Sequence, residues 1–464
     1  MDPVYAHATE TIVARATPSG EGAIGVIRLS GSDAISIADR YFHGKKLEDQ
    51  AGHTLHYGEW KTVEGEALDE VVAALFKGPH SYTKEDVVEI SCHGSPFILR
   101  RILEMCIEAG ARLAEPGEFT LRAYLNGRMD LSQAEAVADL ISSSSAAAHH
   151  MAMHQLKGGV SREIGELREK LIEFASLIEL ELDFAEEDVE FADREKFLEL
   201  VRRIREKVVR LMESFSLGNA IKEGIRTVIA GRPNAGKSTL LNALLEEDRA
   251  IVSDIPGTTR DTIEEMLTIR GVQFRIIDTA GIREAHDQIE AIGVERTMQA
   301  LQQSALIVYV FDITTVSPEE LAEDIRKLDA GKIPLLLAAN KMDLNPHEKA
   351  QRFAVSDLAE EQIIPVSAKN NMNVGFIKDK MYDLAVAHQL EKGETLVSNA
   401  RHYGALLRTR ESLDAVLKGM EDGVTNDWIA MDIRQALHYL GEITGAISTE
   451  DLLDNIFSNF CIGK

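Results

Sequence analysis

The chain is predicted to be a multidomain protein, in which an α+β amino-terminal domain precedes helices that enclose an inserted α/β domain. Three observations lead to this prediction. Short apolar runs alternate with turns over residues 1–123. Apolar residues then recur at spacings of three and four, and this spacing returns after residue 387. Between the two helical stretches, the Gly-rich segment Gly231–Ser238 separates a strand-like run from a helical one.

The amino-terminal domain is expected to combine strands with helices. The runs Gly22–Leu29 and Asp86–Ile90 are rich in apolar residues and bounded by turn residues, as is typical of strands. A helical spacing of apolar residues follows from Ile98 to Ala109. Residues 1–123 therefore form the predicted α+β domain.

Residues 124–222 and 388–464 are predicted to form one discontinuous all-α domain. Amphipathic spacing is clearest in Ile164–Leu180 and Phe197–Leu211. Two independent helical domains are the alternative, because spacing alone does not say which helices pack together. The inserted residues 223–387 have a length suited to one doubly wound α/β domain.

The segment Gly231–Ser238, Gly-Arg-Pro-Asn-Ala-Gly-Lys-Ser, is typical of a phosphate-binding P-loop. It follows the apolar run Thr227–Ala230 and precedes the helical pattern Thr239–Leu245. Glycines let backbone N–H groups close around phosphate oxygens, and the start of a helix adds positive potential. Lys237 is expected to reach the outer phosphates and Ser238 to bind magnesium. The sequence therefore predicts binding of a nucleoside triphosphate.

Two later segments indicate that the base is guanine. Asn340-Lys341-Met342-Asp343 closes the apolar run Ile333–Ala339, at the carboxyl end of a buried strand. The Asp343 carboxylate can accept hydrogen bonds from the ring N–H and the exocyclic amine of guanine. Adenine would leave it facing a lone pair, which is unfavourable. Ser367-Ala368-Lys369, after the strand-like Ile363–Val366, resembles the second guanine-contacting loop of GTPases.

The two switch segments of a GTPase are expected between these loops. Asp278-Thr279-Ala280-Gly281 follows a strand-like run and resembles the segment that holds magnesium through water and contacts the γ-phosphate. Gly257–Asp261 lies where the magnesium-binding threonine belongs, and Thr259 is assigned that role. With Ser238, Thr259 completes the predicted magnesium site.

The glutamine that orients water in Ras-like enzymes is missing. Ile282 and Arg283 occupy the positions just after the Asp-Thr-Ala-Gly segment. The carboxylates of Glu284 and Glu290 are the candidates for orienting water in its place, although either would more often be a solvated surface charge.

Composition favours a cytoplasmic protein without a membrane span. Cys92, Cys106 and Cys461 are too few and too scattered for a disulfide framework or a zinc site. The first residues lack an export signal, and the longest apolar runs suit buried strands. Because the net charge is −26, any contact with RNA requires a local basic patch or the surface of a partner.

Motifs along the whole chain resemble the MnmE (TrmE) family of bacterial and organellar tRNA modification GTPases. The Asn234 of the P-loop is one of them. The others are Thr11–Ala14 with Ala16–Pro18, Pro116–Ala123, Leu125–Leu131 and the carboxyl-terminal Phe460–Lys464.

The resemblance implies a homodimer joined through amino-terminal domains that are similar to tetrahydrofolate-binding enzymes. With the flavoprotein MnmG, which carries FAD and uses NADH, such proteins add an aminomethyl or carboxymethylaminomethyl group to carbon 5 of the wobble uridine of certain tRNAs. The one-carbon unit would come from 5-formyl- or methylene-tetrahydrofolate. The resemblance assigns the folate contacts to Arg28, Glu89, Arg128 and Lys464, although many relatives carry Lys at the position of Arg128.

The resemblance also implies how GTP hydrolysis is catalysed. Two Ras-like GTPase domains would meet face to face, and a potassium ion beside the phosphates would supply positive charge. Glu290 matches the carboxylate that orients water indirectly, so Glu284 becomes the weaker candidate. The potassium ligands would be Asn234, Ser253, Ile255 and Thr258.

The full set of residues predicted to contact GTP combines the motifs with this resemblance. It comprises Asn234, Ala235, Gly236, Lys237, Ser238, Thr239, Ser253, Asp254, Ile255, Pro256, Gly257, Thr258, Thr259, Asp278, Thr279, Ala280, Gly281, Asn340, Lys341, Asp343, Ser367, Ala368 and Lys369.

Several alternatives stay open at this stage. Cys461 is fourth from the end, but Gly463 and Lys464 match a prenylation signal poorly, and the thiol could act as a nucleophile or only shape a folate site. The chain could also be a regulatory or ribosome-assembly switch GTPase. It could instead be a folate-dependent transferase whose GTPase domain only times the reaction.

Overall fold

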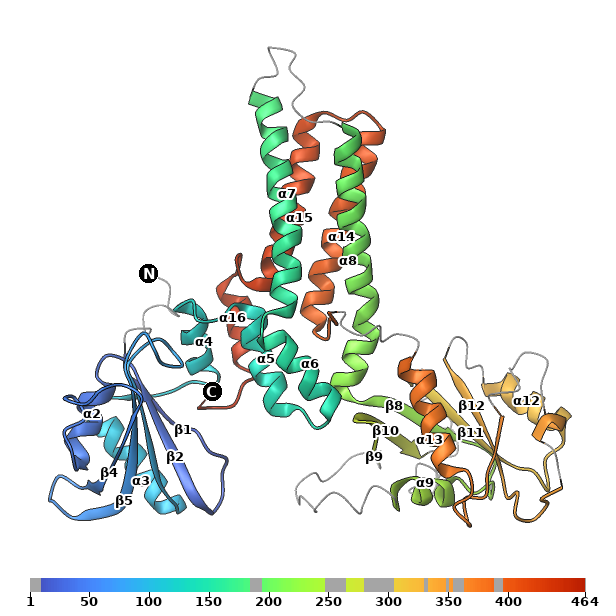
Figure 1. Cartoon of the computed structure of the whole chain (residues 1–464), viewed down its shortest axis with the longest axis horizontal. Helices are drawn as coiled ribbons and strands as arrows, with labels where there is room; N and C mark the ends of the chain where they lie inside the picture. Colours follow the sequence, from blue (N-terminus) through green and yellow to red (C-terminus); the bar gives the residue numbers. More distant parts are fainter. Residues whose placement is uncertain are drawn as a thin grey trace, which may run out of the picture. The chain divides into compact units, whose positions relative to one another are not determined.

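The computed structural model describes residues 10–183, 194–246, 264–278, 304–328, 333–347, 350–353, 363–387 and 395–463 (Figure 1). The chain forms two compact units. Unit 1 comprises Met1–Ala138, His154–Phe197 and Ser412–Lys464, and unit 2 comprises Asp139–Met153 and Leu198–Glu411.

Unit 1 contains a seven-stranded sheet with the strand order β3-β4-β5-β6-β2-β1-β7. The paired strands are antiparallel, except that β1 and β7 are parallel. The strands are β1 Ile12–Arg15, β2 Gly22–Ser30, β3 Phe42–His43, β4 Thr54–Lys61, β5 Ala67–Phe76, β6 Val87–Gly94 and β7 Arg112–Leu113.

Two helices, α2 Ala34–Tyr41 and α3 Pro96–Glu108, cover one face of this sheet. Ile27 and Leu29 of β2 are fully buried in the core that these helices complete. Because side chains alternate along a strand, Arg28 lies on the opposite face. This second face is covered in part, by Phe119 and Tyr82, and is called the open face because Ile24, Leu55 and Tyr57 are exposed on it. It carries Arg28 and Glu89, to which the family resemblance assigned folate contacts.

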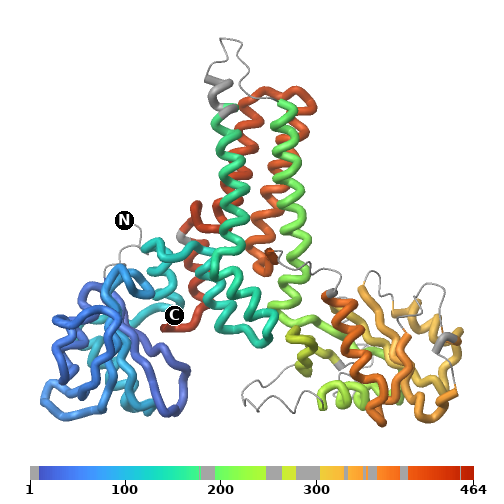
Figure 2. The backbone as a smooth tube through the Cα atoms, viewed as in Figure 1, coloured from blue at the N-terminus to red at the C-terminus, as the bar shows by residue number. Residues whose placement is uncertain are grey.

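The remaining helices of unit 1 include α4 Glu118–Leu125, α7 Gly159–Asp183, α15 Asn426–Thr444 and α16 Glu450–Phe457. Helices α7 and α15 pack along each other, and α16 packs on α4. The carboxyl-terminal residues then run along the amino-terminal domain, where Ile462 forms a bridge with Pro116 (Figure 2). The carboxyl-terminal segment thus contacts the amino-terminal domain within one unit.

Unit 2 contains a six-stranded sheet with the order β13-β12-β11-β8-β10-β9. All the paired strands are parallel except β9 and β10, which form an antiparallel hairpin. The strands are β8 Ile225–Ala230, β9 Glu264–Ile269, β10 Val272–Asp278, β11 Leu306–Asp312, β12 Leu335–Asn340 and β13 Ile363–Pro365.

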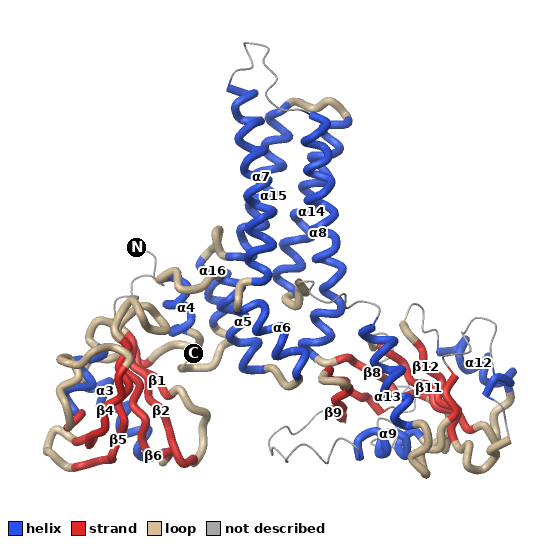
Figure 3. Tube along the Cα trace, viewed as in Figure 1, coloured by secondary structure: helices blue, strands red, loops and turns tan. Residues whose placement is uncertain are grey.

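Helices cover both faces of this sheet (Figure 3). The helices α9 Lys237–Glu246 and α13 Val374–Tyr382 pack on one face, and α12 Pro318–Leu328 packs on the other. A short 3₁₀ turn, η2 Ala350–Phe353, and a π-helical turn, η4 Asp383–Ala387, complete the domain. The chain order of the strands reverses around β8, so the carboxyl end of β8 is the expected ligand-binding edge.

Four further helices have residues in unit 2: α5 Leu131–Ser142, α6 Ala146–Leu156, α8 Arg194–Glu223 and α14 Ala400–Glu421. Within unit 2, Phe215 of α8 stacks on Tyr403 of α14 with ring centroids 4.7 Å apart. The predicted α+β, all-α and α/β parts are all present. The boundaries at residues 123, 222 and 387 stay predictions, because the division into two units cuts through helices instead. Among the described helices, none is long and apolar enough to cross a membrane.

Candidate functional site

The predicted P-loop connects β8 to α9 at the carboxyl edge of the sheet in unit 2. Gly231 and Gly236 have positive φ angles of 148° and 96°, and Asn234 has a φ of 62°. A side chain on Gly231 would meet the carbonyl oxygen of Val310, and one on Gly236 would meet the Asn340 amide. The loop therefore needs glycine at both ends, for conformation and for close packing.

Lys237 lies in the first turn of α9 and is largely buried. Its Nζ donates hydrogen bonds to the carbonyl oxygens of Gly231 and Arg232, at 3.0 and 3.1 Å. A fixed ammonium group thus lies inside a loop that also presents the amino-terminal end of a helix. This donor set fits the outer phosphates of a nucleotide.

Asn340 joins the P-loop to the two predicted guanine loops. Its Nδ2 donates to the Ala235 carbonyl oxygen at 2.9 Å, and its Oδ1 accepts from the Ala368 backbone N–H at 3.1 Å. The Ser367 hydroxyl donates to Asp343 Oδ1 at 2.6 Å. Asn340 is buried, so these contacts hold three separate segments of sequence together at one edge of the sheet. Lys369 lies in the exposed turn that follows.

Asp312, which ends β11 beside these loops, was not among the residues predicted from the sequence. Its Oδ2 accepts from Lys341 Nζ at 2.6 Å, and its Oδ1 accepts from the Thr314 hydroxyl at 2.7 Å. Burial would raise the pKa of the Asp312 carboxyl, but the hydrogen bonds from Lys341 and Thr314 outweigh burial and hold it below its usual value. The position of Asp312 directly after an apolar run was the signal that could have found it.

The switch residues fall mainly outside the described part of the chain. Of Asp278–Gly281, only Asp278 has a described backbone, at the end of β10, where it pairs in register with Ile229 of β8. Ser238, the last residue of the P-loop, and Thr239 lie in the first turn of α9. Twelve further residues with predicted roles lie outside the described part of the chain: Ser253, Asp254, Ile255, Pro256, Gly257, Thr258, Thr259, Thr279, Ala280, Gly281, Glu284 and Glu290.

A second group of predicted residues comes together on the open face of the sheet in unit 1. Arg28 and Glu89 are register partners on β2 and β6, and Nε and Nη2 of Arg28 each lie 2.8 Å from Glu89 Oε1. Arg28 also donates to the carbonyl oxygen of Gly463 at 3.3 Å. Its guanidinium carbon lies 5.6 Å from the ring centroids of Tyr82 and Phe119.

Arg128, which is distant in sequence from Arg28, also contacts the Tyr82 ring. Its guanidinium carbon is 5.5 Å from the Tyr82 ring centroid, and it donates to the carbonyl oxygen of Ser81. A cavity of about 450 Å³ lies here, lined by His53, Phe76, His80, Ser81, Tyr82, Val87, Glu89 and Arg128. Aromatic walls with two opposite charges suit a ligand that has a flat ring system and a carboxylate. Lys464 lies outside the described residues.

The three cysteines differ sharply in their surroundings. Cys92 and Cys106 are buried, and burial raises the pKa of each thiol to about 12, with the charge of Asp69 adding to the effect at Cys92. Cys461 is exposed, and its carbonyl oxygen accepts a hydrogen bond from Gly117 N–H at 3.4 Å. Cys461 is therefore the accessible thiol, two residues from the Gly463 that contacts Arg28.

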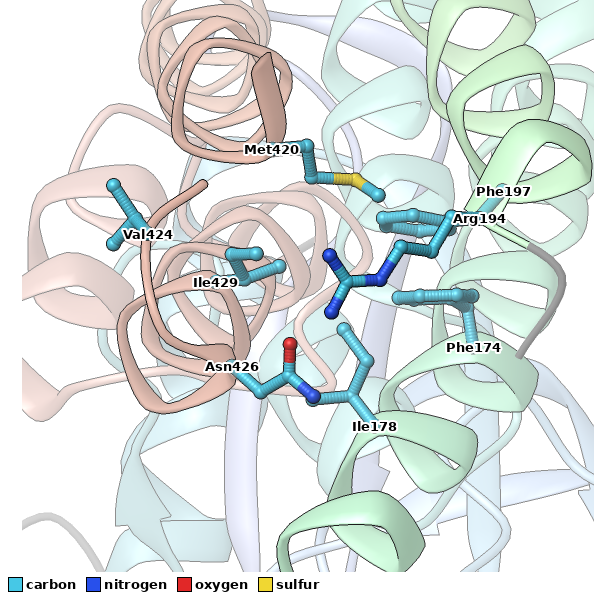
Figure 4. Close-up of a pocket in the computed structure, with 8 residues that line it drawn as sticks. All are labelled: Phe174, Ile178, Arg194, Phe197, Met420, Val424, Asn426 and Ile429. Atoms are coloured by element: carbon cyan, nitrogen blue, oxygen red, sulfur yellow. The ribbon is translucent and has the colours of Figure 1, made fainter. Parts of the chain in front are cut away.

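A small pocket in the helical part of unit 1 has no link to the predicted sites. Figure 4 shows the Arg194 side chain pointing into it between apolar side chains. It is lined by Phe174, Ile178, Arg194, Phe197, Met420, Val424, Asn426 and Ile429, none of which sequence analysis selected.

Comparisons with known proteins cover nearly the whole length of the chain. Residues 11–128 match the family model described as the GTP-binding protein TrmE N-terminus, and residues 131–461 match the model of the MnmE helical domain. Proteins named tRNA modification GTPase MnmE are 55% identical over 456 residues in Cytophaga hutchinsonii and 51% over 472 residues in Christiangramia forsetii. The alignments cover 98% of this chain, and 98% and 99% of those proteins, respectively.

Solved structures give a weaker likeness. A GTP-binding protein from Sulfolobus solfataricus in complex with GDP is 21% identical, with a TM-score of 0.27, over 48% of this chain and 67% of that one. That score is too low to indicate a shared activity.

Proposed function

Because the chain belongs to the MnmE family of tRNA modification GTPases, we propose that it hydrolyses GTP to GDP and phosphate during modification of the wobble uridine of certain tRNAs. The observation that supports the nucleotide site best is the pair of hydrogen bonds made by Asn340, which join the P-loop to the Ser367–Lys369 loop. Asp343 lies in the same cluster and would accept from guanine, while Lys237 and the start of α9 would face the phosphates.

The modification itself would need a partner and a one-carbon donor. The flavoprotein MnmG, with FAD and NADH, would act with this chain to add an aminomethyl or carboxymethylaminomethyl group to carbon 5 of the uridine. Folate would supply the carbon when bound in unit 1. The cavity beside Arg28, Glu89 and Arg128 supports this role, because a stacked aromatic ring and cations suit a pterin and a glutamate tail.

Potassium and magnesium would assist GTP hydrolysis. Magnesium would be held by Ser238 and Thr259, and potassium by Asn234 with Ser253, Ile255 and Thr258. Charge spreads over the phosphate oxygens in the transition state, so a fixed cation beside them lowers the barrier. Asn234 supports this assignment because it is an exposed P-loop residue whose amide oxygen is a neutral ligand of the kind that hard cations accept.

A homodimer joined through the amino-terminal domains would bring two GTPase domains together. The open sheet face of unit 1 supports such a contact, since Ile24, Leu55 and Tyr57 are 67%, 71% and 67% exposed on it. Leu55 lies in the same cross-strand row as Glu89 and Arg28. We expect Tyr57→Glu to weaken the dimer in sedimentation experiments, whereas Val63→Glu, a change at an exposed residue outside the strands, serves as the control. An unchanged dimer in the Tyr57→Glu variant would place the contact elsewhere.

The experiment that tests the proposed function compares GTP turnover in potassium and in sodium, at matched ionic strength and several protein concentrations. We expect turnover per molecule to rise with potassium and with protein concentration, because both the ion and the second GTPase domain complete the site. Equal rates in both salts would refute the potassium site at Asn234 and favour a switch GTPase.

Glu290 is proposed to orient the attacking water. We expect Glu290→Ala to slow hydrolysis sharply while GTP affinity is kept, because the carboxylate acts only on water. Glu284→Ala is the matched control and should retain turnover. Near-wild-type turnover of Glu290→Ala would exclude the proposed role.

Cys461 is the accessible thiol near the proposed folate site. Cys461→Ser tests whether it reacts, because a serine keeps the size of the side chain but is a weaker nucleophile. Loss of tRNA modification with folate binding intact would support a covalent role. Retained modification would mean that the thiol only helps to shape the site.

A cytoplasmic location without membrane attachment is proposed because the chain belongs to the MnmE family.

A further inference from the structure

The P-loop residue Arg232 is tied to helix α12 by three hydrogen bonds. Its Nε and Nη2 donate to the two carboxylate oxygens of Asp324 at 2.6 and 3.2 Å. Its Nη1 donates to Glu320 Oε1 at 3.0 Å. The two bonds to Asp324 use the fork of the guanidinium group, which fixes direction as well as distance.

Both carboxylates are themselves held in place. Asp324 Oδ2 also accepts from the hydroxyl of Tyr309, a buried residue of β11, at 2.7 Å. Glu320 Oε2 accepts from Ser317 N–H at 3.0 Å while Ser317 Oγ accepts from Glu320 N–H at 3.2 Å, which is a capping box at the start of α12. An isolated surface ion pair contributes little. Here, however, the acceptors are anchored to a strand and to a helix terminus, so they can position Arg232.

The fixed residue lies two positions before Asn234. Pro233, between them, restricts the backbone, and Asn234 itself has a φ of 62°. The Arg232 carbonyl oxygen accepts from Lys237 Nζ at 3.1 Å, so both the side chain and the backbone of Arg232 form hydrogen bonds. The backbone that leads to Asn234 therefore starts from a residue that is held at both its side chain and its carbonyl oxygen.

We propose that Asp324 and Glu320 are positioning residues for GTP hydrolysis, which hold Arg232 so that the Asn234 oxygen points at the activating cation. This inference rests on the proposed function, in which Asn234 binds potassium. It adds helix α12, on the opposite face of the sheet from α9, to the machinery of the reaction. A ligand oxygen displaced by a fraction of an ångström loses much of its effect on a bound ion.

The binding of GDP should depend far less on this clamp. The diphosphate would contact the later part of the loop and the start of α9, and the base would contact Asp343. Asn340 holds the guanine loops to Ala235 without help from α12. Loss of the clamp is therefore expected to change the response to potassium more than the affinity for GDP.

The test compares Asp324→Asn and Glu320→Gln with Glu323→Gln in the full-length protein. Glu323 is the matched control, since it lies on the same helix and pairs with Lys327 at 2.7 Å in an exposed i, i+4 ion pair that does not reach the P-loop. GTP turnover is measured over a range of potassium concentrations, and GDP affinity is measured with a fluorescent analogue. For Asp324→Asn we expect the half-activating potassium concentration to rise about tenfold, with GDP affinity within about twofold of wild type.

Two further variants are expected to weaken the potassium response to an intermediate degree. Tyr309→Phe removes only the hydroxyl that holds Asp324, so its potassium response should lie between that of wild type and Asp324→Asn. Arg232→Lys keeps the charge but cannot form the fork, and it should also be intermediate. Both remain informative if Asp324→Asn folds poorly, which a melting curve would reveal.

The outcomes separate this inference from the proposed function. A wild-type protein that ignores potassium would refute the ion site at Asn234 and, with it, the positioning role. A potassium-activated wild type whose clamp variants all behave like Glu323→Gln would overturn the positioning role alone. Equal losses of GDP affinity and of potassium response would mean that α12 only stabilises the loop, which also overturns the inference.

Discussion

The two candidate sites of this protein are built in different ways. In unit 2, the phosphate and guanine loops are short contiguous segments, and each follows a strand at the same edge of one sheet. In unit 1, Arg28, Glu89 and Arg128 come from distant parts of the sequence, and Gly463 comes from the opposite end of the chain. A phosphate is bound largely by backbone N–H groups, so a local motif can encode its site. A site made from side chains on a sheet face depends on strand register.

The largest expected effect is at Asp343, the residue proposed to recognise the base. Asp343→Asn should weaken GTP binding by about 10³-fold, because the amide cannot accept two hydrogen bonds from guanine and leaves donors unpaired. Xanthine carries an acceptor where guanine has its amine, so xanthosine triphosphate should bind the variant better than GTP does. Competition of both nucleotides against a fluorescent GDP analogue measures this. Folate binding in unit 1 is the internal control. Loss of folate binding in Asp343→Asn would show that the two sites are not independent.

The second effect concerns the ion pair in unit 1. Arg28→Ala should lower folate affinity and destabilise the sheet, because Glu89 keeps its charge without its partner. We expect a loss of about 2 kcal/mol in folate binding. Titration calorimetry with 5-formyl-tetrahydrofolate measures it, and the exposed Arg100→Ala on α3 is a control, since its nearest ion pair is long, at 3.8 Å. Wild-type folate affinity in Arg28→Ala would remove this residue from the site.

The third effect is the pH dependence of unit 1. Burial would raise the pKa of Glu118, but hydrogen bonds from Arg112 and the Glu115 N–H, and the charge of Arg122, hold it below the ordinary value of 4.5. Because the pKa of Glu118 is lower in the folded protein than in the unfolded chain, its ionised carboxylate stabilises the fold at pH above about 4.5. This stabilisation is lost as the pH falls through the pKa that Glu118 has in the folded protein. Glu118→Gln should therefore be less stable at neutral pH and lose less stability on acidification.

Denaturant unfolding of both proteins between neutral and acid pH measures this difference. Glu104→Gln on α3 is the control, because Glu104 makes exposed ion pairs. Parallel pH profiles for wild type and Glu118→Gln would show that this buried network does not set the acid sensitivity of unit 1.

The smallest effect is expected at the conservative cation of the unit 1 site. Arg128→Lys should change folate affinity only severalfold, since the charge is kept while the flat contact with Tyr82 is lost. Arg128→Gln should lose more, and the same calorimetric titration compares them. Equal losses in both variants would indicate that stacking on Tyr82, and not charge, is what Arg128 contributes.

The sequence was sufficient for much of the architecture. Apolar spacing predicted the helices around α3, α7, α8 and α9, and strand-like runs predicted β2, β6, β8, β10, β12 and β13. Strands β4, β5 and β9 and helices α2 and α12 are among the elements that no named run predicted. Strand order was out of reach, because β1 and β7 pair although most of the amino-terminal domain separates them in sequence. Pairing between distant strands depends on the whole sheet and not on local propensity.

The residues of the candidate sites also fall into those that the sequence predicted and those that only the structure revealed. The Asn340-to-Asp343 motif indicated guanine from the sequence, yet the sequence did not reveal that Asn340 would hold two other loops. Asp312, Glu320 and Asp324 were missed, since single carboxylates on loops and helix faces are common and carry no motif. The roles of Glu290 and of the residues around Ser253 stay predictions.

The sequence by itself determined the parts of this protein that act through the backbone and through local spacing: the P-loop, the guanine loops and the long amphipathic helices. Those features depend on residues within one or two turns of each other. Only the tertiary structure decided which side chains from distant parts of the sequence contact each other. It joined Arg28 to Glu89 and Gly463, and Arg232 to Asp324, because strand register and helix packing bring together residues that sequence distance separates.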